Sequence, residues 1–285
     1  MVLTKEIQKK ICDFVYIKPR TIQEISKHID VNWHTADSYV DKIAQQEGVL
    51  ATITFRGGTK GALKIAYWLN LENVRANSFK DRIFKQIESG KRKEDFSPSE
   101  IYQFVDSDKK KIEVLTDKNL NSEKNSNNFK NLLESSENQV LFFSGNLTFS
   151  NMKSHDLLIR NVVEKLALKN VSIKVLTRVE IPGMKNIRDL LVINDRLGKE
   201  MVEVRHCFQP LRLTIIDNKI AVFKEIFDPK NYAVGELKER IIVLYYIYDE
   251  EWITWLREVF WTLFRVSISA QKRIEDFKSI IEFAN

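Results

Sequence analysis

Apolar residues recur at helical spacing through the first 47 residues of the chain and predict three successive helices. In the third predicted helix, residues 32–46, the positions expected to face a core are Ala36, Tyr39, Val40 and Ile43. Two β-prone runs, residues 49–55 and 62–69, follow and flank the glycine-rich segment 56–61. Glycine permits the positive φ angles that a hairpin tip needs. The order of three helices and a hairpin predicts a winged helix-turn-helix.

The pattern changes twice after residue 75. Short helices are predicted near residues 79–88 and 97–105, and a stretch rich in Lys, Asn and Ser, around residues 119–128, indicates a solvated linker. The apolar run 139–147, the helix 156–170 and the run 171–179 then have the spacing of a parallel strand pair with a helical crossover. Further strands are predicted at 202–208, 211–225 and 240–248, before a helical segment at 250–283.

These patterns predict an α+β multidomain protein. Residues 1–75 are expected to form the winged helix-turn-helix, residues 76–127 a helical and partly solvated linker, and residues 128–285 a C-terminal α/β domain with a mixed sheet. The last helical segment carries Trp252, Trp255 and Trp261. We expect its aromatic side to be a buried packing face or a dimer seam, with a lid over a ligand as the alternative.

Composition limits the function classes. The chain has 285 residues, of which 44% are hydrophobic and 29% charged, so it can bury a core. No apolar run is long enough to span a bilayer, and the N-terminus lacks an apolar signal core, so a cytoplasmic protein is expected. Two cysteines and four histidines without a CxxC pair argue against structural zinc, and we expect no metal and no cofactor. The net charge of +6 is spread along the chain, so a nucleic-acid role must be argued from local architecture.

The winged helix-turn-helix provides that architecture. In such domains the third helix lies in the major groove and its N-terminal residues face base edges. The residues expected to face outward on this helix are Asn32, Trp33, His34, Thr35, Ser38 and Lys42. Arg56 and Lys60 at the hairpin tip are placed to contact the DNA backbone. Double-stranded DNA is therefore the predicted partner, and a winged helix that contacts protein instead is the alternative.

The segment 202–225 resembles the hairpin that carries the HxKxxxxD motif of the phospholipase D superfamily. Aligned on Asp217, the position of the nucleophilic His holds Pro210, and that of the phosphate-binding Lys holds Arg212. Proline offers no nucleophile, whereas an arginine still suits an anion. The resemblance covers roughly Phe129 to Phe264 and implies a phospholipase D-like domain without catalytic activity. Pro210, Arg212 and Asp217 then mark a degenerate motif and a possible anion site.

A winged helix followed by an inactive phospholipase D-like domain resembles archaeal transcriptional regulators of the TrmB-like group. The resemblance implies the architecture and the general role of a DNA-binding regulator. Our leading hypothesis is a sequence-specific regulator that forms a homodimer through its C-terminal domain. The degenerate pocket of that domain would bind a small anionic effector, a nucleotide or a partner, or would serve only in dimerisation. Two other functions remain open at this point. One is a phosphodiesterase or nuclease of the phospholipase D type, and the other is a winged-helix adaptor in a repair or replication complex.

Overall fold

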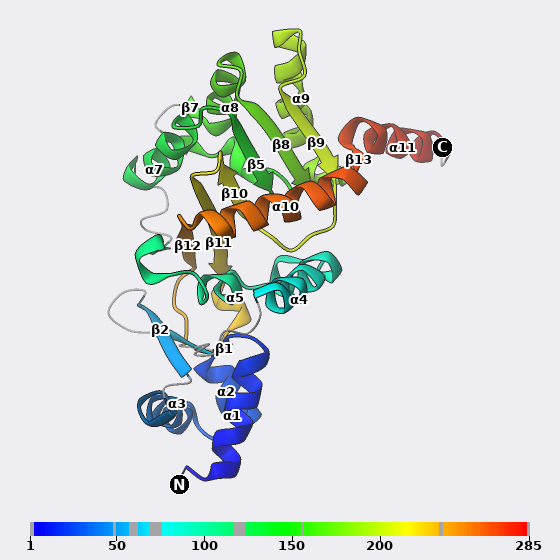
Figure 1. The fold of residues 1–285 in the computed structure, drawn as a ribbon. Coiled ribbons are helices and arrows are strands. Elements are labelled where there is room, and N and C mark those ends of the chain that lie inside the picture. Colours follow the sequence, from blue (N-terminus) through cyan, green and yellow to red (C-terminus); the bar gives the residue numbers. More distant parts are fainter. Residues whose placement is uncertain are drawn as a thin grey trace.

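The computed structural model describes residues 3–47, 50–56, 62–68, 76–116, 123–154, 157–233 and 236–283. Figure 1 shows a small N-terminal region, residues 3–68, followed by a larger region, residues 76–283, built on a wide sheet. We call them the winged region and the α/β region. The expected class, α+β with a mixed sheet, is confirmed.

The winged region has three helices and a three-stranded antiparallel sheet in the order β1-β3-β2. Its elements are α1 (Lys5–Ile17), β1 (Arg20–Thr21), α2 (Ile22–His28), α3 (Trp33–Glu47), β2 (Leu50–Arg56) and β3 (Ala62–Trp68). The helix α2 begins at a capping box, because Glu24 N–H donates to Thr21 Oγ1 and Thr21 N–H donates to a Glu24 carboxylate oxygen. The four positions predicted to face the core from α3 are buried, which confirms that expectation.

The α/β region is built on an eight-stranded mixed sheet in the order β13-β9-β8-β5-β10-β11-β12-β4. Its helices are α4 (Ala76–Ser89), α5 (Ser99–Tyr102), α7 (Glu123–Glu134), α8 (Ile159–Leu168), α9 (Met184–Leu197), α10 (Glu250–Val266) and α11 (Ala270–Phe283). The strands of the large sheet are β4 (Lys110–Thr116), β5 (Gln139–Phe143), β8 (Ser172–Thr177), β9 (Val202–His206), β10 (Leu213–Ile216), β11 (Ile220–Phe227), β12 (Ile241–Ile247) and β13 (Ile268–Ser269). Two short strands, β6 (Lys153–Ser154) and β7 (Leu157–Leu158), pair with each other. As predicted, β5 and β8 are parallel and are joined through α8.

Helices cover the large sheet with two separate cores. On one face, α4 and α10 pack through residues such as Ile87 and Phe260 against Phe223 of β11. On the other face, α8 and α9 bury Val163 and Ile187. The aromatic side of α10 is thus mainly a packing face, since Trp252, Phe260 and Phe264 are buried and Trp255 and Trp261 partly buried against the same core.

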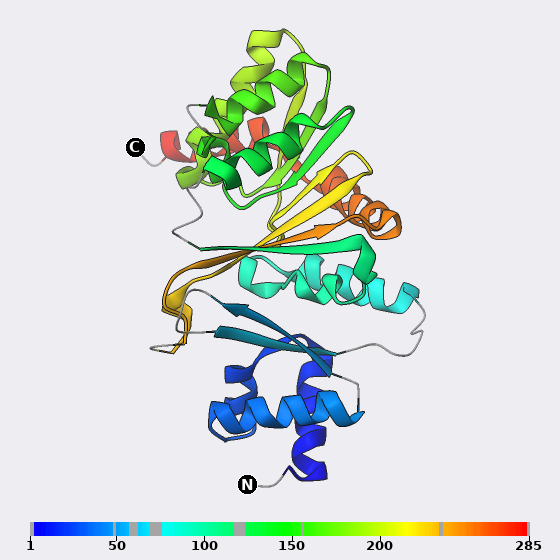
Figure 2. The ribbon, with the colours of Figure 1, turned by 90° about the vertical axis from the view of Figure 1, so that its left-hand side faces the viewer.

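The small sheet shares a core with the α/β region. Phe55, Leu63 and Ile65 of β2 and β3 belong to the same buried cluster as Phe227 of β11, and the ring centroids of Phe55 and Phe227 are 6.0 Å apart. In Figure 2, α4 and α5 lie between the small sheet and the large sheet. The helix α3 lies on the far side of the small sheet, away from the α/β region (Figure 1).

Three segments differ from the expected pattern. Residues 110–116, expected within the linker, form the edge strand β4, because Ile112 and Val114 alternate with polar residues and pack on the core shared with α4 and α10. The segment 250–283, expected to be one long helix, is interrupted by β13, which pairs with β9. Arg205 of β9 stabilises this break by donating to the carbonyls of Phe264 and Ser267. Of the stretch expected to be a solvated linker, residues 119–128, the first four residues lie outside the described residues, and residues 123–128 belong to the helix α7 instead.

Candidate functional site

The residues predicted to contact DNA from α3 fall into two groups. Asn32 precedes the helix, and its Oδ1 accepts hydrogen bonds from the Thr35 amide at 2.9 Å and from Thr35 Oγ1 at 3.0 Å. An acceptor at this position satisfies an amide that the helix leaves without a partner. Asn32 and Thr35 therefore cap α3, and their contact with bases remains a prediction.

The other predicted α3 residues form an exposed face. Trp33 is 50% exposed and its ring stacks on that of His34, with centroids 3.8 Å apart. Ser38 and Lys42 follow at helical spacing and are both exposed. This face combines a flat aromatic pair, a hydroxyl and an ammonium group, which are groups that contact bases and phosphates.

Two acidic residues on α3 are neutralised from the small sheet. Lys64 of β3 places Nζ 2.6 Å from Asp37 Oδ1 and 2.6 Å from Asp41 Oδ1. Although burial lowers the pKa of Lys64, its hydrogen bonds and charge interactions with both carboxylates raise it above the ordinary value. Lys64 thus remains charged and offsets negative charge that would otherwise repel a DNA backbone.

The two predicted hairpin-tip residues are not placed. Arg56 is the last residue of β2, and its side chain lies outside the described portion of the chain. Lys60 lies outside the described residues altogether. Their contact with the DNA backbone stays a prediction.

A cavity of about 1640 Å³ opens where the two regions meet. The winged region contributes residues of α2 such as Gln23 and Glu24, and the α/β region contributes the loop after β5, the segment 93–100, and strands β10 to β12. Among the described residues that line this cavity there is no histidine and no cysteine.

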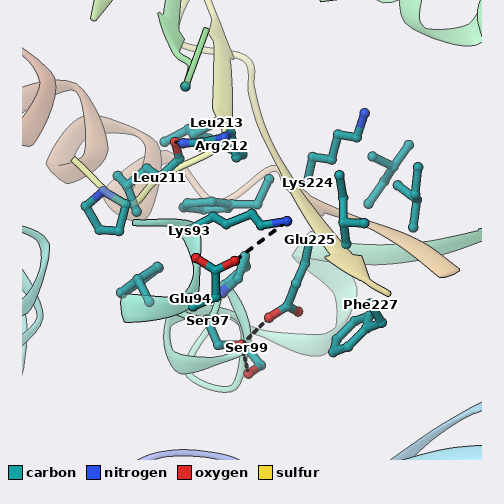
Figure 3. Close-up of a pocket in the computed structure, with 18 of the residues that line it drawn as sticks. Lys93, Glu94, Ser97, Ser99, Leu211, Arg212, Leu213, Lys224, Glu225 and Phe227 are labelled. Atoms are coloured by element: carbon teal, nitrogen blue, oxygen red, sulfur yellow. Dashed lines mark hydrogen bonds and ion pairs between the residues drawn. The ribbon is translucent and has the colours of Figure 1, made fainter. Parts of the chain in front are cut away.

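Arg212 and Lys224 form a pair of like charges on one wall of this cavity. They are cross-strand neighbours, since Lys224 N–H donates to the Arg212 carbonyl at 2.8 Å and their flanking residues are paired in the β10–β11 ladder. The guanidinium of Arg212 lies against Gly145, where any side chain would overlap it. Figure 3 shows Lys224 on this wall and the adjacent Glu225 pointing the opposite way, toward Ser97.

The charges at this wall perturb one another. Burial, and after it the nearby charge of Arg178, together lower the pKa of Arg212 to about 10, with Glu94 acting in the opposite sense. Burial also lowers the pKa of Lys224, to which Arg240 and Arg212 add. Within the described residues, Arg178, Arg212 and Lys224 form no ion pair, and Arg178 Nε is buried without a hydrogen-bond partner. Like charges directly across a ladder are destabilising, so this wall is suited to an anion that would relieve the repulsion.

The structure separates the three residues of the degenerate motif. Pro210 is buried beside Arg212, and its ring fits against Gly90, where a Cβ atom would be 2.8 Å from Pro210 Cγ. Asp217 does not line the cavity. Its carboxylate accepts hydrogen bonds from three successive backbone amides, those of residues 137–139, at 2.8–3.0 Å.

Asp217 therefore joins the β10–β11 turn to the start of β5. The backbone φ of Asp217 is 49°, in the region that Asp tolerates in turns. Although burial raises the pKa of this carboxyl, the three amides lower it below the ordinary value. The carboxylate of Asp217 is therefore used within the fold, and the structure does not bring it together with Arg212 at the cavity wall.

Outside the motif, His206 and Cys207 have the side chain types that most often act in catalysis. His206 Nδ1 accepts a hydrogen bond from the Val179 amide at 3.0 Å, and burial, followed by the charge of Arg273, lowers its pKa, with Glu180 opposing. Burial raises the pKa of the Cys207 thiol. Neither residue lines the cavity, and this arrangement gives both a structural role.

A second polar cluster on the cavity wall was not found from the sequence. Glu225 accepts hydrogen bonds from Ser97 Oγ at 2.8 Å and from Tyr245 Oη at 2.7 Å. The pKa of Glu225 is raised to about 7, mainly by burial and further by the charge of Glu100, while the two hydrogen bonds act in the opposite sense. The signal that could have found it is Lys-Glu in the middle of the apolar run 220–227, since two adjacent charges inside a buried strand require partners on both faces.

Two other kinds of site are absent from the described residues. No described helix is long and apolar enough to cross a membrane. Within the ranges that the structure describes, no three His, Cys, Asp or Glu residues are grouped so that they could hold a metal ion.

Comparisons with known proteins give low similarities. No family model and no curated protein sequence matches the chain. Similar solved structures include NucT from Helicobacter pylori, with 12% identity and a TM-score of 0.39, covering 56% of this chain and 99% of NucT. TrmBL2, an archaeal chromatin protein, has 14% identity and a TM-score of 0.38, covering 93% of this chain and 94% of TrmBL2. Nuc from Salmonella typhimurium, a phospholipase D family member, has 9% identity and a TM-score of 0.38, covering 56% of this chain and 97% of Nuc. Because these values are low, we base the proposed function on the site alone.

Proposed function

We propose that this protein is a DNA-binding transcriptional regulator whose winged region contacts duplex DNA through α3. The observation that carries the proposal is the exposed face of α3, with Trp33, His34, Ser38 and Lys42 pointing away from the core. Lys64 supports it by neutralising Asp37 and Asp41 on the same helix. The fixed attachment of the small sheet to the α/β region also supports it, because a rigid mount orients a recognition helix without further ordering cost.

In this proposal the cavity is a regulatory site for a small anion and not a catalytic centre. Arg212 and Lys224 supply binding groups, and Arg178 adds positive charge nearby, while Pro210 occupies the position where the resemblance would require a nucleophile. Residues of α2 also line the cavity, so an occupant that extends from the wall with Arg212 to α2 would contact both regions. A homodimer would present two α3 helices to a two-fold symmetric DNA site.

The decisive test is sequence selection from random duplex DNA, followed by fluorescence anisotropy on the selected duplex. We expect Lys42→Glu to weaken binding at least tenfold, because it reverses a charge on the contact face. Ser38→Ala should change sequence preference by about 1–3 kcal/mol if its hydroxyl meets a base edge. The control is Lys169→Glu, which makes the same change of net charge on the exposed surface beside α8.

Each remaining alternative has its own outcome. If the folded protein binds no duplex after selection from random DNA, the proposal is contradicted, and the protein adaptor is then the better reading. Hydrolysis of DNA or of a chromogenic phosphodiester that disappears in Arg212→Ala would make the cavity an active site. We expect no such turnover, since no histidine or cysteine lines the cavity within the described residues.

A further inference from the structure

The strand β4 forms one edge of the large sheet. It pairs with β12 over seven residues, from Lys110↔Ile247 to Thr116↔Ile241. Among the described residues, no strand pairs with the opposite side of β4. An edge of this length offers a row of backbone donors and acceptors to another strand.

The hydrogen bonding of β4 fixes which backbone groups point outward. Tyr248 N–H donates to the Lys109 carbonyl at 2.8 Å, which makes these two residues a hydrogen-bonded pair at the end of the ladder. Because such pairs alternate along an antiparallel ladder, Lys111 and Glu113 bond to β12. The amide and carbonyl groups of Lys110, Ile112 and Val114 therefore point away from the sheet.

We propose that β4 pairs antiparallel with β4 of a second copy of this chain, centred on Ile112. The inference rests on the homodimer in the proposed function and assigns its interface. Pairing Ile112 with its own copy uses only outward-facing backbone groups, and it places Lys110 opposite Val114 of the other chain. The same register places Lys111 directly opposite Glu113 of the other chain, twice by symmetry.

Charge and shape select this register over its neighbours. A register centred on Glu113 would oppose two carboxylates, and one centred on Lys111 would oppose two ammonium groups, which is destabilising on a sheet. The register centred on Ile112 instead makes two opposite-charge pairs. On the other face of the strand, Ile112 and Val114 already pack on the core that contains α10, so pairing would extend this apolar face across the two-fold axis.

The structure also explains why the dimer does not use α10. The helix turns Trp252 and Phe260 into the core of its own chain, and Trp255 and Trp261 are partly buried there. This leaves a smaller apolar area on α10 than the sequence suggests. The open edge of β4 needs no such area, because backbone hydrogen bonds supply the pairing.

Cysteine cross-linking tests the register in the full-length chain. In a background of Cys12→Ser and Cys207→Ser, Ile112→Cys should form a disulfide-linked dimer on mild oxidation, because residue 112 faces its own copy. Val114→Cys is the matched variant and should not, since residue 114 faces residue 110. Cross-linking of Val114→Cys with none of Ile112→Cys would overturn the register.

Charge reversal tests the same pairing without cysteine. Lys111→Glu and Glu113→Lys should each weaken dimerisation about tenfold in sedimentation, because two attractive pairs become repulsive. The double variant should restore it, which a folding defect would not do. Lys169→Glu beside α8 is the control for net charge and should leave the dimer unchanged.

The outcomes separate this inference from the proposed function. A dimer that resists both reversals overturns the β4 interface and leaves DNA binding through α3 intact. A chain that is monomeric throughout a micromolar series overturns both the interface and the dimeric regulator. A chain that cross-links at residue 112 but binds no DNA keeps the interface and contradicts the regulator.

Discussion

Lys224 and Glu225 are adjacent on β11, and their side chains lie in two different environments. Because side chains alternate across a strand, Lys224 reaches the cavity wall with Arg212, while Glu225 reaches Ser97 and Tyr245 on the opposite face. Burial lowers the pKa of Lys224 and raises the pKa of Glu225, so both shifts favour the neutral form of the side chain. Such groups cost stability, and they persist where a binding function requires them.

Removing the lysine should stabilise the empty protein and abolish its response to anions. Lys224→Met keeps the aliphatic stem and removes one member of the like-charge pair, so we expect a gain of about 0.5–1 kcal/mol and a rise of about 1–4 °C in Tm. In thermal melts at matched ionic strength, phosphate should raise the Tm of the native chain more than that of the variant. Lys169→Met, on the exposed surface beside α8, controls for the general stabilising effect of phosphate. Equal shifts in all three proteins would count against an anion site.

Glu225 should make stability depend on pH between about 4.5 and 7. Burial, opposed by its two hydrogen bonds and aided by Glu100, raises its pKa from 4.5 to about 7. The folded chain therefore keeps a proton that the unfolded chain releases. The stabilisation is fully present below pH 4.5 and is lost as pH rises to 7, by roughly 2–3 kcal/mol.

The variant Glu225→Gln removes this titration while retaining groups that can bond Ser97 and Tyr245. Its free energy of unfolding in urea should fall less than that of the native chain between pH 4.5 and 7. Glu258→Gln on the exposed surface of α10 is the matched control and should follow the native curve. Parallel curves for the native chain and Glu225→Gln would show that this carboxyl titrates normally.

At the scale of elements, the start of α3 combines capping with the proposed DNA contact, and the two can be separated at Asn32. Asn32→Ala removes the acceptor for Thr35 and should cost about 1 kcal/mol of stability. Asn32→Asp keeps an acceptor, so stability should be retained, while DNA affinity should fall because a negative charge is added beside the contact face. Chemical denaturation and anisotropy on the same samples measure both. An aspartate variant with native affinity would place Asn32 away from the DNA.

The sequence predicts an element well when the spacing of its apolar residues marks one buried face. The core face of α3 follows from the helical spacing of Ala36, Tyr39, Val40 and Ile43, and the structure confirms it. The strand β4 was missed because two lysines and a glutamate share its seven residues, and only the partner β12 shows that the apolar residues among them face a core. The local sequence pattern does not show which strand an edge strand pairs with.

The candidate site divides in the same way. Arg212 was found because a motif position marks it. Lys224 lies on the other strand of the same hairpin and Arg178 in another segment, and both approach Arg212 only in the folded chain. Asp217 shares the motif, yet its five-residue separation from Arg212 along β10 takes it to the opposite end of the strand, among the amides of residues 137–139. Spacing along the chain therefore indicates the residue types and not which of them face one another.

For the whole molecule, one shared core joins the winged region to the α/β region. Phe55 of β2 contacts the same cluster as Phe227 of β11, and Leu63 and Ile65 belong to it as well. Because the small sheet that carries α3 belongs to this core, α3 does not swing freely about a linker. A ligand in the cavity between α2 and the large sheet would lie beside this contact between the two regions.

Truncating Phe227, which contacts the small sheet from the α/β region, should uncouple the two regions. We expect the native chain to unfold in one transition, and Phe227→Ala to lose about 2–4 kcal/mol and to unfold in two steps, with the winged region first. Hydrogen exchange followed by mass spectrometry resolves the two regions directly. The control is Ile193→Ala on α9, which opens a cavity in the other core of the large sheet and should destabilise the chain without splitting its transition. If the native chain already shows separate protection for residues 3–68 and 76–283, the small sheet is only docked on the α/β region, and an occupant of the cavity would then act by changing how often the two regions separate.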